Sequence, residues 1–198
     1  MRLPQLSPRL RMVAELVPPG STVADIGTDH AWLPVYLVQQ GISPRVIAAD
    51  IADGPLENAA NTIARAGLQE QITLRQSDGF SCFAAQDATC WVLAGIGGTL
   101  MARLLSAASW LCAPGTMLVA QPQSRANELL DWLHENGFTV TETRTCTDNK
   151  RTYTALRAVY PASASAPSVT PCGVPAPPHA GEPLATSAQH IKYPPRSG

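Results

Sequence analysis

The stretch VADIGTDHAWLP, residues 23–34, decides the fold. In it a short apolar run ends at Asp25, a glycine follows at position 27, and Asp29 and His30 stand just before a second apolar run. Carboxylates at the mouth of a buried strand cost desolvation free energy unless a partner offsets it. The stretch therefore predicts a strand, a tight turn and a helix, with acids that either tie the turn or hold a ligand.

The same succession of apolar run, turn and helical period recurs along the chain. Apolar runs predict parallel strands over residues 21–27, 45–51, 71–79, 88–98 and 115–122. Helical periodicity predicts helices over residues 6–17, 31–41, 54–67, 99–111 and 124–137. Alternating runs predict a terminal hairpin over residues 138–146 and 151–160. Together they predict an α/β fold with a Rossmann-like, seven-stranded, mostly parallel sheet, helices on both faces and an antiparallel last strand pair.

The net charge, the cysteines and the lengths of the apolar runs make several classes of protein improbable for this chain. The chain has 198 residues and a formal net charge of −1, so its overall charge does not indicate a polyanionic partner. Its five cysteines form no C-x-x-C pair, which favours reduced thiols over a disulfide framework or a zinc site. No apolar run approaches the ~20 residues of a membrane span, and no secretory signal is evident. We expect a cytoplasmic monomer that binds neither a metal nor a membrane.

The sequence changes character near residue 160. Residues 161–198 carry nine of the eighteen prolines and few large apolar side chains. Such a segment buries too little surface to offset the entropy of ordering. We expect one folded domain over residues 1–160 and a disordered Pro/Ala/Ser-rich tail over residues 161–198, dispensable rather than a peptide-recognition segment.

The ends of the predicted parallel strands carry the residues that indicate a ligand. In doubly wound sheets, ligands bind where the strands end at their carboxyl side. Acids close the first three strands, glycines close the fourth, and a Gln-Pro pair closes the fifth: Asp25, Asp50, Asp78-Gly79, Gly95-Ile-Gly97-Gly98 and Gln121-Pro122. Gly27 lies where the backbone must turn, and we expect that a Cβ there would clash.

These residue types suit an adenosine-bearing cofactor. An acid at Asp50 can accept hydrogen bonds from both ribose hydroxyls, and Asp78 can accept from an adenine amino group. A dinucleotide requires G-x-G-x-x-G to hold its pyrophosphate, whereas the first turn here has one glycine and two acids. A carboxylate at Asp29 would repel a pyrophosphate but suits the amino-acid end of S-adenosylmethionine. The chemistry thus favours S-adenosylmethionine over NAD.

Several of these motifs resemble a known family. DIGTDHAWLP at the first strand, D-x-x-DGP at residues 50–55, DG at 78–79, LAGIGGTLM at 93–101 and QP at 121–122 are similar to the bacterial tRNA adenine-N1 methyltransferases called TrmK. The resemblance runs in order from about residue 5 to about residue 158. It implies a Rossmann-like domain that uses S-adenosylmethionine to methylate N1 of adenine 22 in tRNA.

The resemblance also implies roles for individual residues. Asp29 would be the catalytic carboxylate. The implied cofactor contacts are Asp25, Gly27, Asp50, Ile51, Asp78, Gly79, Ala94 and Gly95. The implied substrate contacts are His30, Gly97, Gly98, Gln121 and Pro122, and Tyr153 matches an aromatic residue of the family.

Two departures from the family and several alternatives remain. TrmK-like proteins continue into a helical C-terminal domain, where this chain has its proline-rich tail, and residues 1–160 hold twelve Lys/Arg against fourteen Asp/Glu with no basic stripe. Alternatives are a methyltransferase for another RNA or a small molecule, a cofactor-binding protein that no longer catalyses, and a nicotinamide-dependent oxidoreductase. Asp29 could also cap the following helix, and Asp50 could tie the following turn.

Overall fold

The computed structural model describes residues 6–162, and the predicted tail at 161–198 lies outside the described residues except for its first two positions. The helices are α1 (Pro8–Leu16), α2 (Trp32–Gln39), α3 (Asp53–Ala66), α4 (Gly98–Ser106) and α5 (Ala126–Glu135), with 3₁₀ turns η1 (Ala85–Asp87) and η2 (Ser109–Leu111). The strands are β1 (Val23–Ile26), β2 (Val46–Asp50), β3 (Ile72–Gln76), β4 (Cys90–Ile96), β5 (Met117–Pro122), β6 (Thr139–Asp148) and β7 (Arg151–Val159). Each predicted element is present, most of them one to three residues shorter at their ends than the sequence indicated.

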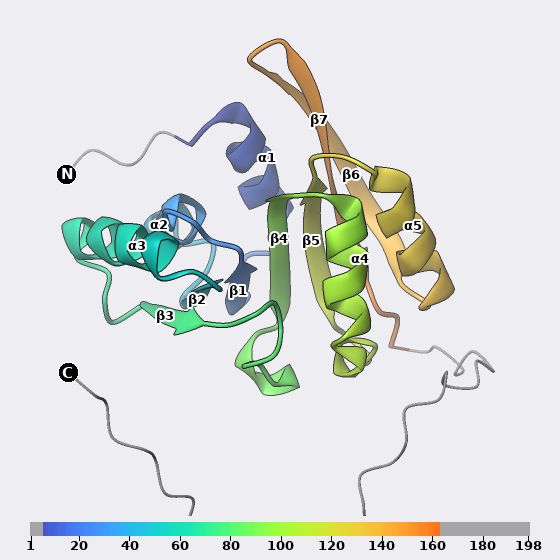
Figure 1. Cartoon of the computed structure of the whole chain (residues 1–198), viewed down its shortest axis with the longest axis horizontal. Coiled ribbons are helices and arrows are strands. Elements are labelled where there is room, and N and C mark those ends of the chain that lie inside the picture. The colour runs from blue at the N-terminus through green and yellow to red at the C-terminus, as the bar shows by residue number, and fades with distance from the viewer. Residues whose placement is uncertain (1–5, 163–198) are drawn as a thin grey trace, which may run out of the picture. The chain divides into compact units, whose positions relative to one another are not determined.

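The strands form one seven-stranded sheet in the order β3-β2-β1-β4-β5-β7-β6 (Figure 1). The first five strands are parallel, while β7 runs antiparallel to both β5 and β6. This topology confirms the predicted Rossmann-like fold class. β5 pairs with β7 only from Leu156 to Val159, so the tip of the β6–β7 hairpin extends beyond the parallel strands.

Two apolar layers hold the helices against the two faces of the sheet. One buried cluster joins side chains of α1, α2 and α3, for example Leu16 and Leu37, to one face. The other joins side chains of α4 and α5, for example Met101 and Leu129, to the opposite face. Strands covered on both faces must be apolar throughout, and β1 is buried at all four positions. The sheet is therefore a rigid base for whatever lies at its carboxyl edge.

The start of α5 differs from the prediction. Serine is a favoured N-cap residue and Ser124 begins the helix predicted over residues 124–137, but the N-cap is Arg125, which has a left-handed φ of 53° and makes no side-chain cap. The Ser124 carbonyl instead accepts a 2.8 Å hydrogen bond from the N–H of Gly98. Because that bond ties the loop to the start of α4, the chain turns into α5 one residue later than expected.

Within residues 6–162 the cysteines are free thiols, and no group of His, Cys, Asp or Glu side chains is arranged to hold a metal. Cys90 is fully buried in β4, where burial raises the pKa of its thiol to about 12. No helix in the described range is long and apolar enough to cross a bilayer.

Candidate active site

Two cavities open at the carboxyl edge of the sheet, where the central strands β1 and β4 lie side by side. The chain leaves these two strands toward opposite faces, which is the place where doubly wound sheets bind ligands. The first cavity has a volume of about 350 Å³ and the second about 330 Å³. Both are lined by Gly27, Asp50 and Ile96, so they are neighbours that meet at these residues.

The loop after β1 has an unusual backbone. Gly27, Asp29 and Ala31 all have positive φ, at 82°, 52° and 55°. A non-glycine residue in this region costs of order 1 kcal/mol and persists only where the surroundings hold it. A Cβ built on Gly27 meets nothing within 4 Å, so the expected clash there is wrong, and the backbone conformation is what requires glycine.

Asp29 does not cap the helix that follows it. The N-cap of α2 is Ala31, and no side chain accepts a hydrogen bond from the first turn. The Asp29 side chain is 65% exposed and lines the first cavity. The capping alternative is therefore excluded, and the carboxylate is available to a ligand.

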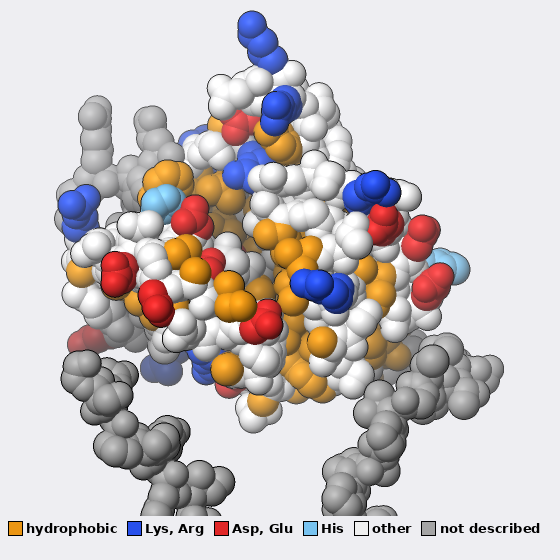
Figure 2. Space-filling view, in the orientation of Figure 1, with side chains coloured by type: hydrophobic (Ala, Val, Ile, Leu, Met, Phe, Trp, Pro, Cys, Tyr) orange, Lys and Arg blue, Asp and Glu red, His pale blue; other side chains and the backbone are white. Residues whose placement is uncertain are grey.

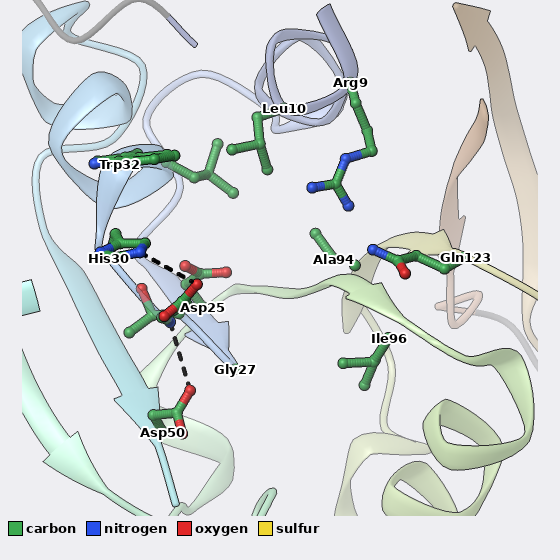
Figure 3. A pocket seen from close by; sticks show the side chains of 14 residues that line it. Arg9, Leu10, Asp25, Gly27, His30, Trp32, Asp50, Ala94, Ile96 and Gln123 are labelled. Carbon is green, nitrogen blue, oxygen red and sulfur yellow. Dashed lines mark hydrogen bonds and ion pairs between the residues drawn. The ribbon is translucent and has the colours of Figure 1, made fainter. Parts of the chain in front are cut away.

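Trp32 and His30 lie one above the other at one wall of the first cavity (Figure 3), and Asp29 lines the same cavity. His30 Nε2 lies 3.6 Å from Asp29 Oδ2, and the imidazole stacks on the Trp32 ring with centroids 4.7 Å apart and planes 14° from parallel. The contact with Asp29 and the stack on Trp32 both orient the imidazole, and His30 lines the first cavity beside them.

Asp25 lies at the floor of the same cavity and is almost fully buried. Burial raises the pKa of its carboxyl to about 6, the nearby Thr28 side chain opposes this rise, and the negative charge of Asp50 adds to it. The Thr28 hydroxyl is itself buried and makes no hydrogen bond within the described residues. A buried acid beside a buried hydroxyl with no partner is a polar floor that a cationic ligand would satisfy.

Asp50 occupies the boundary between the cavities. Its Oδ1 accepts from the N–H of Ala52 at 3.1 Å, and its Oδ2 accepts from the N–H of Asp29 at 3.4 Å. Asp50 thus ties its own turn and also links it to the loop after β1. Both oxygens retain further acceptor positions, so this bracing does not exclude a ligand.

The second cavity contains the predicted cofactor contacts that the first cavity lacks. Ile51, Asp78 and Gly79 line it, and the Ile51 side chain is 59% exposed. Leu104 of α4 faces Gly79 so closely that a Cβ there would lie 2.5 Å from Leu104 Cδ2. The cavity combines apolar side chains such as Ile51, Ile96 and Leu104 with the acids Asp50 and Asp78, a lining that suits a flat ring with polar edges.

The small residues at the end of β4 and the start of α4 divide into two groups. Ala94 and Gly95 line the first cavity, whereas Gly97 and Gly98 line neither cavity. A Cβ on Gly98 would lie 2.1 Å from the carbonyl oxygen of Arg125, so this glycine lets the start of α4 approach the loop before α5. The structure thus places Gly98 at a packing contact, and its predicted substrate contact stays a prediction.

Gln121 and Pro122 are buried and line neither cavity. Gln121 Oε1 accepts a 3.1 Å hydrogen bond from Arg9 Nη1, and its Nε2 donates to the Pro122 carbonyl. Gln121 therefore positions Arg9, and a substrate contact through it or through Pro122 stays a prediction.

The structure adds cavity residues that the strand ends did not indicate. Arg9 comes from α1 and lies over the Tyr153 ring at 5.6 Å, and Gln123 comes from the loop after β5. Figure 3 shows both across the cavity from Trp32. Other side chains in this group are Leu10, Thr28, Leu33 and Ile96. The exposed Trp32 inside DIGTDHAWLP was the one signal in the sequence that could have marked this wall.

Comparison with known proteins decides the family. A family model described as Methyltransferase domain matches residues 6–156. The chain belongs to this methyltransferase-domain family. The match excludes the nicotinamide-dependent alternative and confirms S-adenosylmethionine as the cofactor predicted for the domain.

Relatives of this methyltransferase domain confirm the resemblance to TrmK. The tRNA (adenine(22)-N(1))-methyltransferase of Bacillus subtilis is 34% identical over 152 residues, which are 77% of this chain, and the chain spans 64% of that relative's length. The match to the crystal structure of B. subtilis TrmK covers 80% of this chain and 67% of the TrmK chain, at 34% identity and a TM-score of 0.76. A Streptococcus pneumoniae relative solved with S-adenosyl-L-methionine is 31% identical, covers 79% and 74% of the two chains and has a TM-score of 0.74.

Proposed function

We propose that this methyltransferase domain transfers a methyl group from S-adenosylmethionine to N1 of an adenine in tRNA. The observation that carries the proposal is the free Asp29 carboxylate on the cavity wall, held at a left-handed φ with no capping role. The named activity of the B. subtilis relatives supports the choice of tRNA and of adenine N1.

The two cavities fit the two ends of the cofactor. The amino-acid end is a zwitterion, and the first cavity offers the buried acid Asp25 and the guanidinium of Arg9. In this assignment Asp50 accepts from the ribose at the boundary, and Asp78 with Gly79 receives the adenine in the second cavity, against Ile51. The glycine at position 95 keeps the passage toward the reacting methyl group free of a side chain.

When bound, S-adenosylmethionine supplies a methyl group already activated on a sulfonium. Adenine N1 lies on the Watson–Crick edge, so the base must enter the cavity unpaired. N1 forms a bond to the methyl carbon as the carbon–sulfur bond breaks and the electron pair stays on sulfur. The base gains the positive charge, and Asp29 accepts a hydrogen bond from N6–H, stabilises that charge and can take the proton.

The Lys and Arg side chains do not form a continuous basic patch for tRNA on the face that Figure 2 shows. Figure 2 shows them scattered singly among acidic and apolar side chains on the visible face. Arg144, one of the arginines that could contact a phosphate, is paired with Glu15 at 2.6 Å and Glu142 at 2.8 Å. The proposal therefore rests on the chemistry of the cavity rather than on a basic footprint.

The first experiment is transfer of labelled methyl from S-adenosylmethionine to total tRNA that lacks the modification, followed by nucleoside analysis. We expect 1-methyladenosine as the labelled product. A different labelled nucleoside would overturn the adenine-N1 assignment. Cofactor binding by calorimetry with no transfer to tRNA would overturn the tRNA assignment and favour another substrate or a non-catalytic protein.

A further inference from the structure

Large apolar side chains that stay exposed are few in the described residues, and two of the four mark the cavities. Ile51 lines the second cavity, and Trp32, which is 47% exposed, lines the first. The other two, Leu130 and Val140, line none of the cavities described above. Ile51 already has a partner in the proposed cofactor, whereas Trp32 does not.

Folding does not account for the position of Trp32. Helix α2 packs on the sheet through Leu33, Val35 and Leu37, which are at most 3% exposed. Trp32 is the first residue of that helix, is not part of this buried cluster, and lines the first cavity, where Figure 3 shows its ring next to His30. One face of its ring is covered by His30, and about half of the side chain stays in water.

The surroundings of Trp32 indicate the chemistry of its missing partner. Trp32 and His30 line the first cavity and not the second, whereas Asp50 lines both. The opposite wall carries Arg9 and Gln123, a cation and an amide, beside the apolar side chains of Leu10, Ala94 and Ile96. A flat ring with polar edges satisfies both walls, since its face can stack on indole and its edges can form hydrogen bonds.

We propose that Trp32 stacks on a nucleobase of the RNA substrate as it enters the cavity, with the Trp32–His30 pair as a continuous platform. This inference rests on the proposed function and adds to it a residue that holds the substrate, separate from the carboxylate at Asp29. Because every base has an aromatic face, the platform contributes affinity for RNA rather than the choice of base.

The test separates binding of RNA from binding of cofactor. Trp32→Ala should raise the KM for tRNA about tenfold or more, while the Kd for S-adenosylmethionine changes less than about twofold. Trp32→Phe should restore most of the affinity, since a smaller aromatic still stacks. Leu130→Ala is the matched control, because Leu130 is similarly exposed, at 43%, on α5. An equal rise in the cofactor Kd, or a KM for tRNA unchanged in Trp32→Ala, would overturn the proposal.

A second measurement decides the proposal even if no methyl transfer occurs. Stacking quenches indole fluorescence, so unmodified tRNA and a short single-stranded oligoadenylate are titrated into the protein in the presence of S-adenosylhomocysteine. Quenching that Trp32→Phe removes supports the stack, and with no methyl transfer it would sustain this inference while overturning the proposed function. Absence of RNA binding by the unchanged protein, or quenching that persists in Trp32→Phe, would overturn the stack itself.

Discussion

The carboxyl ends of β1 and β4 belong to adjacent strands and border the same cavity, yet the segments there are built differently. The loop after β1 is shaped by backbone conformation, with positive φ at Gly27, Asp29 and Ala31, and it presents charged side chains. The loop after β4 is shaped by close packing, with Gly98 against the Arg125 carbonyl. The loop after β1 supplies chemical groups, whereas Gly95 at the end of β4 leaves space for a ligand. Changes in the first should therefore affect turnover and binding, and changes in the second should affect stability.

The largest effect is expected at Asp29. Asp29→Asn keeps the shape of the loop, and asparagine tolerates the left-handed backbone. It removes the charge that would stabilise the methylated base, so kcat should fall by about 10²- to 10⁴-fold. Cofactor affinity should stay within about twofold, as calorimetry would show.

Asp131→Asn is the control for this change, because Asp131 is an exposed acid on α5 outside both cavities. Retained turnover in Asp29→Asn would remove Asp29 from the mechanism. It would also show that the β1 loop, like the β4 loop, only shapes the site.

Asp25 should affect cofactor affinity and stability in opposite directions. Its pKa is raised from 3.8 to about 6. In the unliganded protein, stability therefore falls as the pH rises from about 4 to about 6, because the unfolded chain ionises first, and the total is about 3 kcal/mol. A bound ammonium group prefers the ionised carboxylate, so cofactor affinity should fall about tenfold per pH unit below about pH 6.

Calorimetry from pH 5 to pH 8 measures this dependence. Asp25→Asn should weaken cofactor binding at pH 7.5, abolish the pH dependence and raise the free energy of unfolding of the unliganded protein. If the variant binds cofactor as tightly as the unchanged protein, Asp25 is a structural acid and not a ligand.

The β4 side is tested by Gly98→Ala. The added Cβ would press on the Arg125 carbonyl, which can move only with the loop before α5. We expect the free energy of unfolding to fall by about 1–3 kcal/mol. Gly54→Ala is the matched control, since Gly54 also lies in the first turn of a helix but has open space around it, and it should gain about 0.5 kcal/mol. Equal effects of the two changes in urea unfolding would show that the close approach does not constrain the loop.

The sequence predicted the mostly parallel seven-stranded sheet, its antiparallel last strand pair and the residues at the strand ends, because these depend on local periodicity and on general rules of chain connection. The cavity residues Asp25, Asp29 and Asp50 follow from the same rules. The same rules were not sufficient for Gln121. It ends its strand as predicted, but its side chain is buried and accepts a hydrogen bond from Arg9, and it does not line the cavity.

Arg9 and Gln123 could not be predicted in the same way. Arg9 reaches the cavity only because α1 packs beside β5, β6 and β7, a contact between segments more than 100 residues apart. Gln123 lies in a loop whose course depends on the bond between Gly98 and Ser124. Such positions depend on tertiary packing, which a single sequence does not reveal through periodicity.

The smallest effect is expected at Ile51, which lines the second cavity and not the first cavity that Asp29 lines. Its side chain is 59% exposed, so Ile51→Ala removes little buried surface and should change the free energy of unfolding by less than about 0.5 kcal/mol. If the cofactor adenine covers Ile51, that surface becomes buried on binding, and its loss should cost about 1 kcal/mol, or about fivefold in Kd. Calorimetry with S-adenosylmethionine and urea unfolding of the same variant separate the two quantities. Unchanged affinity would mean that the cofactor adenine does not lie in the second cavity. The comparison between the β1 loop and the end of β4 would then apply to the first cavity alone.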